Sequence, residues 1–199
     1  PDAKVENVVP DYEKGGAAAC SILTDSEFFG GSFGDLRQAR SLVKLPLLRK
    51  DFIIDEYQVY QARTLGADVI LLIAAILTEE ECLHFATTAK QLGMEVLLEI
   101  HDEKELSLMN EHIDMLGVNN RHLGSFHTDI ENSFRLVERI KSEAGDDVLL
   151  VSESGLTDYQ DIIRLHEAGF RGFLMGEAFM KTGQPGLALS NLINQLKER

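Results

Sequence analysis

The chain has 199 residues, 44% of them hydrophobic and 26% charged, which is enough to bury one sizeable core, so a single domain over 1–199 is predicted. Its 19 Lys and Arg against 33 Asp and Glu give a formal net charge of -14, which argues against a nucleic-acid or anionic-membrane partner. Cys20 and Cys82 lie in unrelated segments, so neither a disulfide framework nor a zinc cluster is expected and a reducing cytoplasm fits best. The longest apolar run, 69–77, is far shorter than the roughly 20 residues of a membrane span.

Seven short apolar runs predict buried strands, because each is bounded by polar residues or by glycine. In chain order the runs are 17–23, 45–48, 68–73, 94–100, 113–118, 148–151 and 170–175. Glycines that follow helical stretches precede four of them, and each is expected to end its helix with a positive φ: Gly16, Gly66, Gly93 and Gly169. Thr78 and Thr157 mark the starts of two further helices.

Helices alternate with nearly continuous apolar strands, and no hairpin turn joins two strands, so a parallel sheet covered on both faces is predicted. Seven βα units of about 25 residues resemble a (β/α)8 barrel better than an open sheet. The sequence therefore predicts a TIM barrel in which one βα unit is missing.

Polar residues follow four of the strands, and in a barrel such strand ends meet at one mouth. They are Lys50, Glu99, Asn119 and Glu153. Each alone is most simply a solvated strand end or half of an ion pair. The four together suggest an acid and a base, because burial at an apolar mouth brings lysine and carboxyl pKa values towards neutrality.

Two later strands end in small residues, Ser154-Gly155 and Gly176, where backbone N–H groups can approach a phosphate. Simple helix starts are the alternative explanation. We expect the side chain of Glu177 to point away from such a site. The aromatic and glycine-rich loop 26–32 is interpreted equally well as a mobile flap or as a hydrophobic plug. Motifs for a metal, a dinucleotide or a P-loop are not found in the sequence.

Four motifs stand out in the sequence: 21–25 (SILTD) with 28–32 (FFGGS), 48–55 (LRKDFIID), 117–121 (GVNNR) and 151–155 (VSESG). In their order and spacing they resemble indole-3-glycerol-phosphate synthase, and the resemblance covers essentially the whole chain. The resemblance implies a (β/α)8 enzyme of tryptophan biosynthesis without cofactor or metal. That enzyme converts the phosphorylated small molecule 1-(2-carboxyphenylamino)-1-deoxyribulose 5-phosphate to indole-3-glycerol phosphate, carbon dioxide and water.

By position, Lys50 matches the lysine that donates a proton to the substrate carbonyl oxygen during ring closure, and Glu99 matches a glutamate of later proton transfer. Asn119 and Glu153 match polar residues that orient the substrate. The resemblance implies further binding residues: Arg121 and Ser154 as supporting contacts, Phe29 and Phe52 around the anthranilate ring, and Gly155 and Gly176 in the phosphate cradle.

Members of this family begin with a helical extension and a first strand carrying a glutamate, a lysine and a Ser-Pro-Ser-Lys-Gly loop, which this sequence does not contain. Truncation and proteolysis are alternative explanations for the absence of these segments. We therefore expect reduced turnover from this chain alone and self-association through an open barrel edge. Two alternatives stay open at this point: an aldolase-type enzyme with Lys50 as Schiff-base nucleophile, and a non-catalytic partial barrel that binds ligand or itself.

Overall fold

The computed structural model describes residues 4–121, 128–144 and 148–198. The chain forms two compact units, each assembled from separate segments. Unit 1 comprises 1–71, 88–95 and 176–199, and unit 2 comprises 72–87 and 96–175. Across the described residues, no helix is both long and apolar enough to cross a membrane.

The strands of the described chain are β1 (Cys20–Leu23), β2 (Leu47–Lys50), β3 (Val69–Ile73), β4 (Glu95–Ile100), β5 (Met115–Asn119), β6 (Leu149–Glu153) and β7 (Gly172–Leu174). They follow one another in sequence order in a seven-stranded sheet, and β1–β2, β2–β3, β4–β5, β5–β6 and β6–β7 pair in parallel. This confirms all seven predicted strands. The order is that of a (β/α)-barrel sheet.

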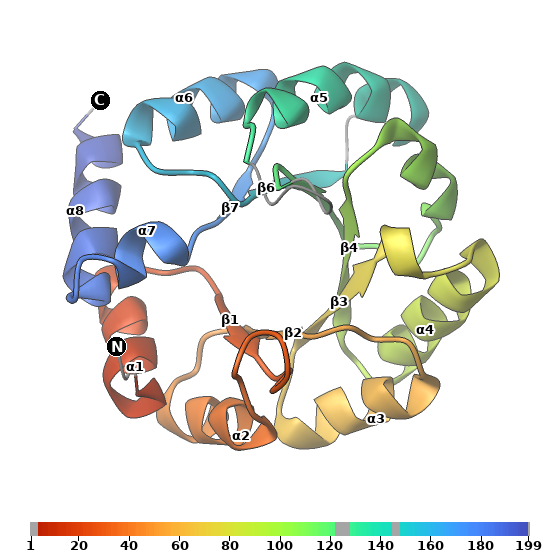
Figure 1. The fold of residues 1–199 in the computed structure, drawn as a ribbon, viewed down its shortest axis with the longest axis horizontal. Coiled ribbons are helices and arrows are strands. Elements are labelled where there is room, and N and C mark those ends of the chain that lie inside the picture. The colour runs from red at the N-terminus through yellow and green to blue at the C-terminus, as the bar shows by residue number, and fades with distance from the viewer. Residues whose placement is uncertain (1–3, 122–127, 145–147, 199) are drawn as a thin grey trace. The chain divides into compact units, whose positions relative to one another are not determined.

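Helices follow the strands in the order of a βα repeat. They are α1 (Val5–Gly15), α2 (Phe33–Leu42), α3 (Glu56–Leu65), α4 (Glu79–Gln91), α5 (Glu131–Ala144), α6 (Tyr159–Ala168), α7 (Glu177–Met180) and α8 (Pro185–Lys197), with 3-10 turns η1 (Ala74–Ile76) and η2 (Glu103–Leu108). Within unit 1, α1 and α8 lie side by side (Figure 1). The four predicted capping glycines have positive φ. Thr78 forms a capping box with Glu81, whereas α6 is capped by Asp158.

Three strands extend beyond the runs predicted from hydrophobicity, and for β5 the extension is the single residue Asn119. β2 continues through Arg49 to Lys50, and β6 continues through Ser152 to Glu153. Arg49, Ser152 and Glu153 are all at most 1% exposed. β2 and β6 therefore end in buried polar groups, which need partners inside the protein.

Arg49 illustrates how such a group is satisfied in unit 1. Its acceptors are Thr24 Oγ1 (3.1 Å), Asp51 Oδ2 (2.8 Å), Gln58 O (2.7 Å) and Gln61 Oε1 (2.9 Å). Thr24 in turn donates to Asp51 Oδ2 at 2.6 Å. Because Gln58 and Gln61 belong to α3, Arg49 faces that helix and joins the end of β2 to it. The backbone on which Lys50 is carried is held by this network.

Replacing Arg49 with methionine should lower the free energy of unfolding by about 3 to 5 kcal/mol, because Asp51 would keep a buried charge without its partner. Chemical denaturation measures the change. The control is Arg139→Met, which removes an exposed ion pair with Glu143 on α5 and should cost far less. Equal costs for the two variants would contradict a structural role for the Arg49 network.

Candidate active site

Lys50 is the last residue of β2 and lies on the strand face opposite Arg49. Successive strand residues point to opposite faces, and Arg49 faces α3, so Lys50 points away from α3. In the β1–β2 register, Lys50 is the partner of Leu23. Its side chain is only partly exposed and has interactions within the protein. An ammonium group is thus placed at a strand end, as the sequence predicts.

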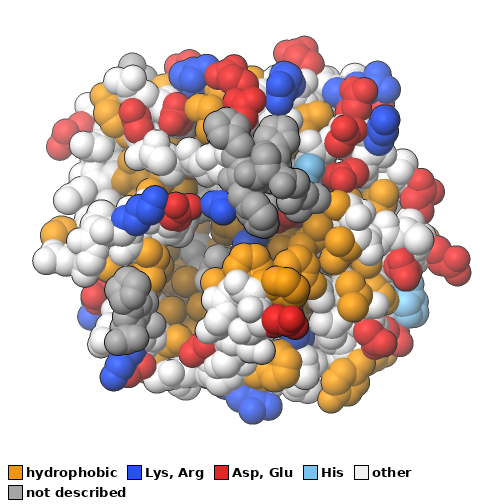
Figure 2. Space-filling view, in the orientation of Figure 1, with side chains coloured by type: hydrophobic (Ala, Val, Ile, Leu, Met, Phe, Trp, Pro, Cys, Tyr) orange, Lys and Arg blue, Asp and Glu red, His pale blue; other side chains and the backbone are white. Residues whose placement is uncertain are grey.

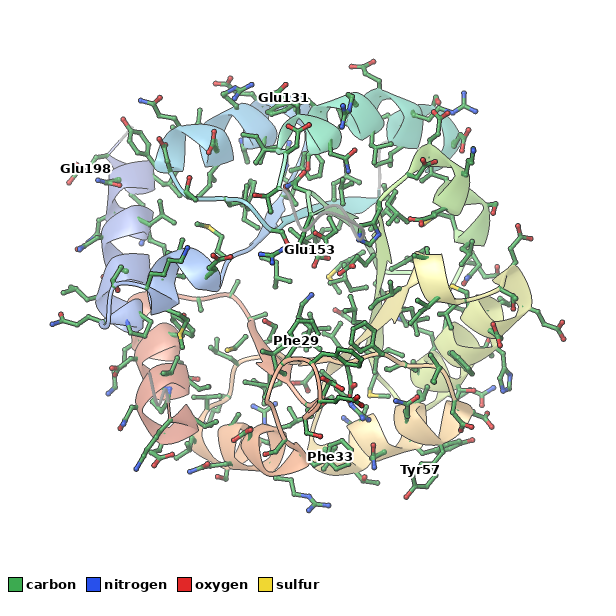
Figure 3. The ribbon with its side chains drawn as sticks, in the orientation of Figure 1. Phe29, Phe33, Tyr57, Glu131, Glu153 and Glu198 are labelled. Carbon is green, nitrogen blue, oxygen red and sulfur yellow. The ribbon has the colours of Figure 1, made fainter. Side chains whose placement is uncertain are left out.

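Aromatic side chains gather close to this strand end. The Phe29 ring stacks on Phe52, with centroids 5.8 Å apart and planes at 19°. The Phe28 ring meets Phe52 edge-on at 5.7 Å. Phe29 projects from the β1–α2 loop (Figure 3), and hydrophobic side chains are exposed beside this loop in Figure 2. The structure therefore brings together Phe29 and Phe52, the two residues predicted to contact an aromatic ring.

The β1–α2 loop is folded back on the end of β1. Asp25 Oδ2 accepts hydrogen bonds from Phe28 N (2.6 Å) and Phe29 N (3.1 Å), and Asp25 O accepts from Gly31 N (2.8 Å). A Cβ at Gly31 would come within 2.2 Å of Leu23 O, so only glycine allows this approach. Phe28 is 71% exposed and Phe29 is 54% exposed, so the loop leaves much of these two rings open to solvent. Its own hydrogen bonds hold the loop in this conformation.

Unit 2 gathers three of the four predicted catalytic residues. Asn119 Nδ2 donates to Glu99 Oε1 at 3.0 Å, and Asn119 is the register partner of Glu153 on the neighbouring strand. Glu99 and Glu153 are 4% and 1% exposed. Figure 3 shows Glu153 at the end of β6, on the side away from α5 and α6. Two buried carboxyl groups and an amide thus line one face of β4, β5 and β6.

Gly117 makes room for one of these carboxyl groups. It precedes Asn119 by two residues and so lies on the same face of β5. A Cβ at this position would come within 2.2 Å of Glu153 Oε1 and 3.3 Å of Leu97 Cδ1. The Glu153 carboxyl group therefore lies directly over the Gly117 backbone. Gly117 opens the motif 117–121, but its role in making room for a carboxyl group was not predicted from the sequence.

The opposite face of the same strand ends carries a second polar network. Asn120 Nδ2 donates to Ser152 Oγ (3.0 Å) and to Ser154 O (3.1 Å), and Asn120 Oδ1 accepts from Ser133 Oγ (2.9 Å). The hydroxyl oxygens of Ser133 and Ser152 are 2.9 Å apart. Because Ser133 belongs to α5, this buried network fixes the ends of β5 and β6 to that helix. It sets the position of Asn119 and Glu153 through the backbone.

His101 is a site residue that the sequence analysis missed. It follows Glu99 by two residues and lies on the same face. His101 Nε2 is 3.5 Å from Glu99 Oε1, and Nδ1 is 3.8 Å from Glu105 Oε2. Its backbone is also held, since His101 N donates to Glu105 Oε2 (2.6 Å) and His101 O accepts from Asn132 Nδ2 (3.2 Å). Two features of the sequence could have indicated His101. Strand alternation places it on the same face as Glu99, and a glutamate follows it four residues later.

Burial and charge act on the pKa of His101 in opposite directions. Desolvation alone would lower it, but the interaction with Glu105 and the charges of Glu99, Glu105 and Glu153 outweigh burial, so the pKa is raised above its ordinary value. The pKa of Glu105 moves the other way. Burial would raise it, yet His101 and the backbone N–H groups of His101 and Asp102 lower it overall. Both shifts favour an imidazolium–carboxylate pair.

The remaining predicted residues occupy loops after the strands. Arg121 N donates to Asn119 Oδ1 at 2.9 Å. Ser154 has φ 65°, the only positive φ among the described non-glycine residues, and Gly155 follows with φ 74°. Such a conformation is costly for serine and is often found at functional sites. Gly176, in unit 1, precedes α7, and Glu177 pairs with Lys181 at 2.7 Å.

Replacing Gly117 with alanine should destabilise unit 2 by about 1 to 3 kcal/mol, because the new methyl group overlaps the Glu153 carboxyl group. Thermal and chemical unfolding measure the loss. Gly34→Ala is the control. Gly34 lies in helix α2, and a Cβ there would meet only the hydroxyl oxygen of the N-cap residue Ser32, at 3.3 Å. Unchanged stability of the Gly117 variant would contradict the placement of Glu153.

The chain is similar to known proteins over most of its length. The profile of the family "Indole-3-glycerol phosphate synthase" matches residues 1–192. Proteins of that name from Bacteroides thetaiotaomicron and Polaromonas naphthalenivorans are 56% and 44% identical to the chain over 98% and 95% of its length, covering 74% and 71% of their own.

A protein of the same name from Magnetococcus marinus is 46% identical over 94% of the chain and 69% of its own length. A crystal structure of 3-hexulose-6-phosphate synthase superposes with a TM-score of 0.69, covering 95% of this chain and 93% of that one. At 13% identity it shows the fold alone, and it confirms the predicted TIM-barrel class. The family profile and the three relatives go further: this chain belongs to the indole-3-glycerol phosphate synthase family.

Proposed function

We propose that the chain catalyses ring closure of 1-(2-carboxyphenylamino)-1-deoxyribulose 5-phosphate to indole-3-glycerol phosphate, as a carboxy-lyase of tryptophan biosynthesis. Membership of the family supports this reaction. The observation that carries the proposal is the pair of buried carboxyl groups, Glu99 and Glu153, held with Asn119 on one strand face. Burying a carboxyl group is costly even when it is paired, and such groups gather at functional sites.

Lys50 is the proposed acid of the first step. As the aromatic carbon attacks the substrate carbonyl carbon, charge develops on the carbonyl oxygen, and the Lys50 ammonium group supplies the proton. Loss of the carboxylate as carbon dioxide then restores the aromatic ring. The position of Lys50 at the end of β2, on the face opposite the Arg49 network, supports this role.

Glu99 is the proposed group of later proton transfer, when the former carbonyl oxygen leaves as water. Its hydrogen bond from Asn119 fixes the direction of one carboxyl oxygen. Asn119 and Glu153 are proposed to orient the substrate, and both are held from behind by the network around Asn120. A preorganised acid–base group of this kind loses little energy to reorganisation during the reaction.

Substrate binding is proposed to use both aromatic and backbone groups. Phe29 and Phe52, already stacked at 5.8 Å, offer apolar faces to the anthranilate ring. Arg121 and Ser154 are proposed as supporting polar contacts. Gly155 and Gly176 are proposed to bind the phosphate through their N–H groups, an assignment favoured by the left-handed backbone at Ser154 and Gly155. Because the net charge is -14, local groups have to attract the anionic substrate.

Lys50→Ala should lower kcat by about 100-fold or more while leaving the fold intact, since a positioned acid contributes 10²–10⁴. Indole fluorescence and carbon dioxide release measure turnover, and circular dichroism checks folding. Lys44→Ala removes an exposed lysine from the same unit and should retain activity. Ordinary turnover by a folded Lys50→Ala variant would remove Lys50 from its role.

The same assay separates the proposal from an aldolase-type mechanism. A Schiff base on Lys50 would be trapped by borohydride as a covalent adduct, visible in the intact mass. We expect no adduct and equal amounts of carbon dioxide and indole product. A trapped adduct would favour the aldolase-type enzyme. A folded chain that binds the substrate without turnover would favour the non-catalytic partial barrel.

Phe29→Ala should raise KM more than it lowers kcat, because it removes an apolar ring face that itself transfers no proton. The change is expected to be about tenfold, comparable to one aromatic contact. Phe28→Ala is the control, because Phe28 lies in the same loop but meets Phe52 edge-on and does not stack on it. Its KM should change less than that of Phe29→Ala. Equal KM values for Phe29→Ala and the unmodified chain would contradict the aromatic contact.

Two properties of the chain stay predictions. Self-association is tested by sedimentation at several protein concentrations, with a rise in mass expected. A cytoplasmic location is tested by fractionating the cells in which the protein occurs, and the chain is expected in the cytoplasmic fraction.

A further inference from the structure

We propose that His101 is a positioning residue that, as a cation held by Glu105, fixes the Glu99 carboxyl group on which the proposed function relies. The inference concerns a residue outside the acid–base set of that reaction. It deepens the proposed function, because the consequence for turnover depends on Glu99 being a proton-transfer group.

The geometry forms a continuous chain of four side chains within unit 2. Glu105 lies 3.8 Å from His101 Nδ1, and His101 Nε2 lies 3.5 Å from Glu99 Oε1. The same Glu99 oxygen accepts the Asn119 amide at 3.0 Å. The two imidazole contacts are longer than the 2.7–3.2 Å of strong N–H···O bonds, so their attraction is mainly between charges.

Hydrogen bonds hold the His101 backbone and the Glu105 side chain in position. Glu105 Oε2 accepts a hydrogen bond from His101 N, and Asp102 caps η2, the 3-10 turn that contains Glu105. These bonds fix the Glu105 carboxyl group beside His101. Asn132, from α5, donates to both His101 O and Asn119 O at 3.2 Å. The ends of β4 and β5 are therefore tied to one amide, which keeps Glu99 and His101 in register with Asn119.

Three carboxyl groups act on His101: Glu99 from β4, Glu105 from η2 and Glu153 from β6. The side chains of His101 and Glu99 are only 12% and 5% exposed, so solvent screens these charges weakly. The imidazolium attracts all three carboxylates, so its loss would increase the net repulsion among these acidic groups. A neutral side chain of similar size would therefore leave Glu99 less well placed.

Stability should depend on pH in a defined direction. His101 has a folded pKa above the ordinary value of about 6.5, so its contribution is complete below that pH and is lost as the pH rises through the folded pKa. The difference in unfolding free energy between the unmodified chain and His101→Asn should be larger at pH 5.5 than at pH 9. The same difference at both pH values would contradict a charged His101.

The direct test is a titration of the His101 Cε1–H resonance by NMR in the purified chain, assigned by its loss in His101→Asn. The midpoint is expected above about 6.5. In Glu105→Gln it should fall by about one pH unit, and Glu99→Gln should lower it as well. Glu103→Gln removes an exposed charge from the same turn and serves as the matched control, with no shift expected. A midpoint at or below 6.5, or one unmoved by Glu105→Gln, would overturn the proposal.

Turnover gives the second readout. In His101→Asn, kcat should fall and the loss of activity that accompanies His101 deprotonation should vanish from the pH profile, while KM changes little. A profile like that of the unmodified chain would overturn the positioning role. Absence of turnover in the unmodified chain would instead overturn the proposed function, and the NMR titration would still decide whether His101 is held as a cation. If His101→Asn does not fold, Glu105→Gln provides the test.

Discussion

Burial of charged side chains at the ends of parallel strands is the constraint on which both units depend. Arg49 and Glu153 are each 1% exposed, and such groups are tolerated only with partners of opposite charge or several hydrogen bonds. In unit 1 the partner is Asp51, supported by acceptors from α3. In unit 2 the imidazole of His101 lies among carboxyl groups. The positions of the reactive groups follow from these pairings.

Strand alternation lets each strand end do two things at once. One residue points to the helices and is satisfied there, as Arg49 and Ser152 are. Its neighbour, Lys50 or Glu153, then points to the other face with its backbone already fixed. A reactive side chain is thereby placed by the residue beside it. Polar residues that never meet substrate can for this reason matter to the reaction.

Hydrophobic runs and capping glycines were enough to predict all seven strands and the (β/α) class. They did not predict where β2 and β6 end, because Arg49, Ser152 and Glu153 are buried through pairing rather than through hydrophobicity. The cluster of Glu99 and Asn119 could be predicted from motifs at strand ends. His101 could not be recognised in the same way, since its partner Glu105 follows in a 3-10 turn that hydrophobic periodicity does not reveal.

The central claim is that the Glu99 carboxyl group, held by His101 and Asn119 within unit 2, serves the reaction. A kinetic double-mutant cycle on His101→Asn and Glu99→Gln, measured as kcat/KM for indole formation, tests it most directly. Groups that serve one reaction should give a double variant little worse than the more impaired single variant. Fully additive losses, or a Glu99→Gln variant with undiminished turnover, would contradict the account.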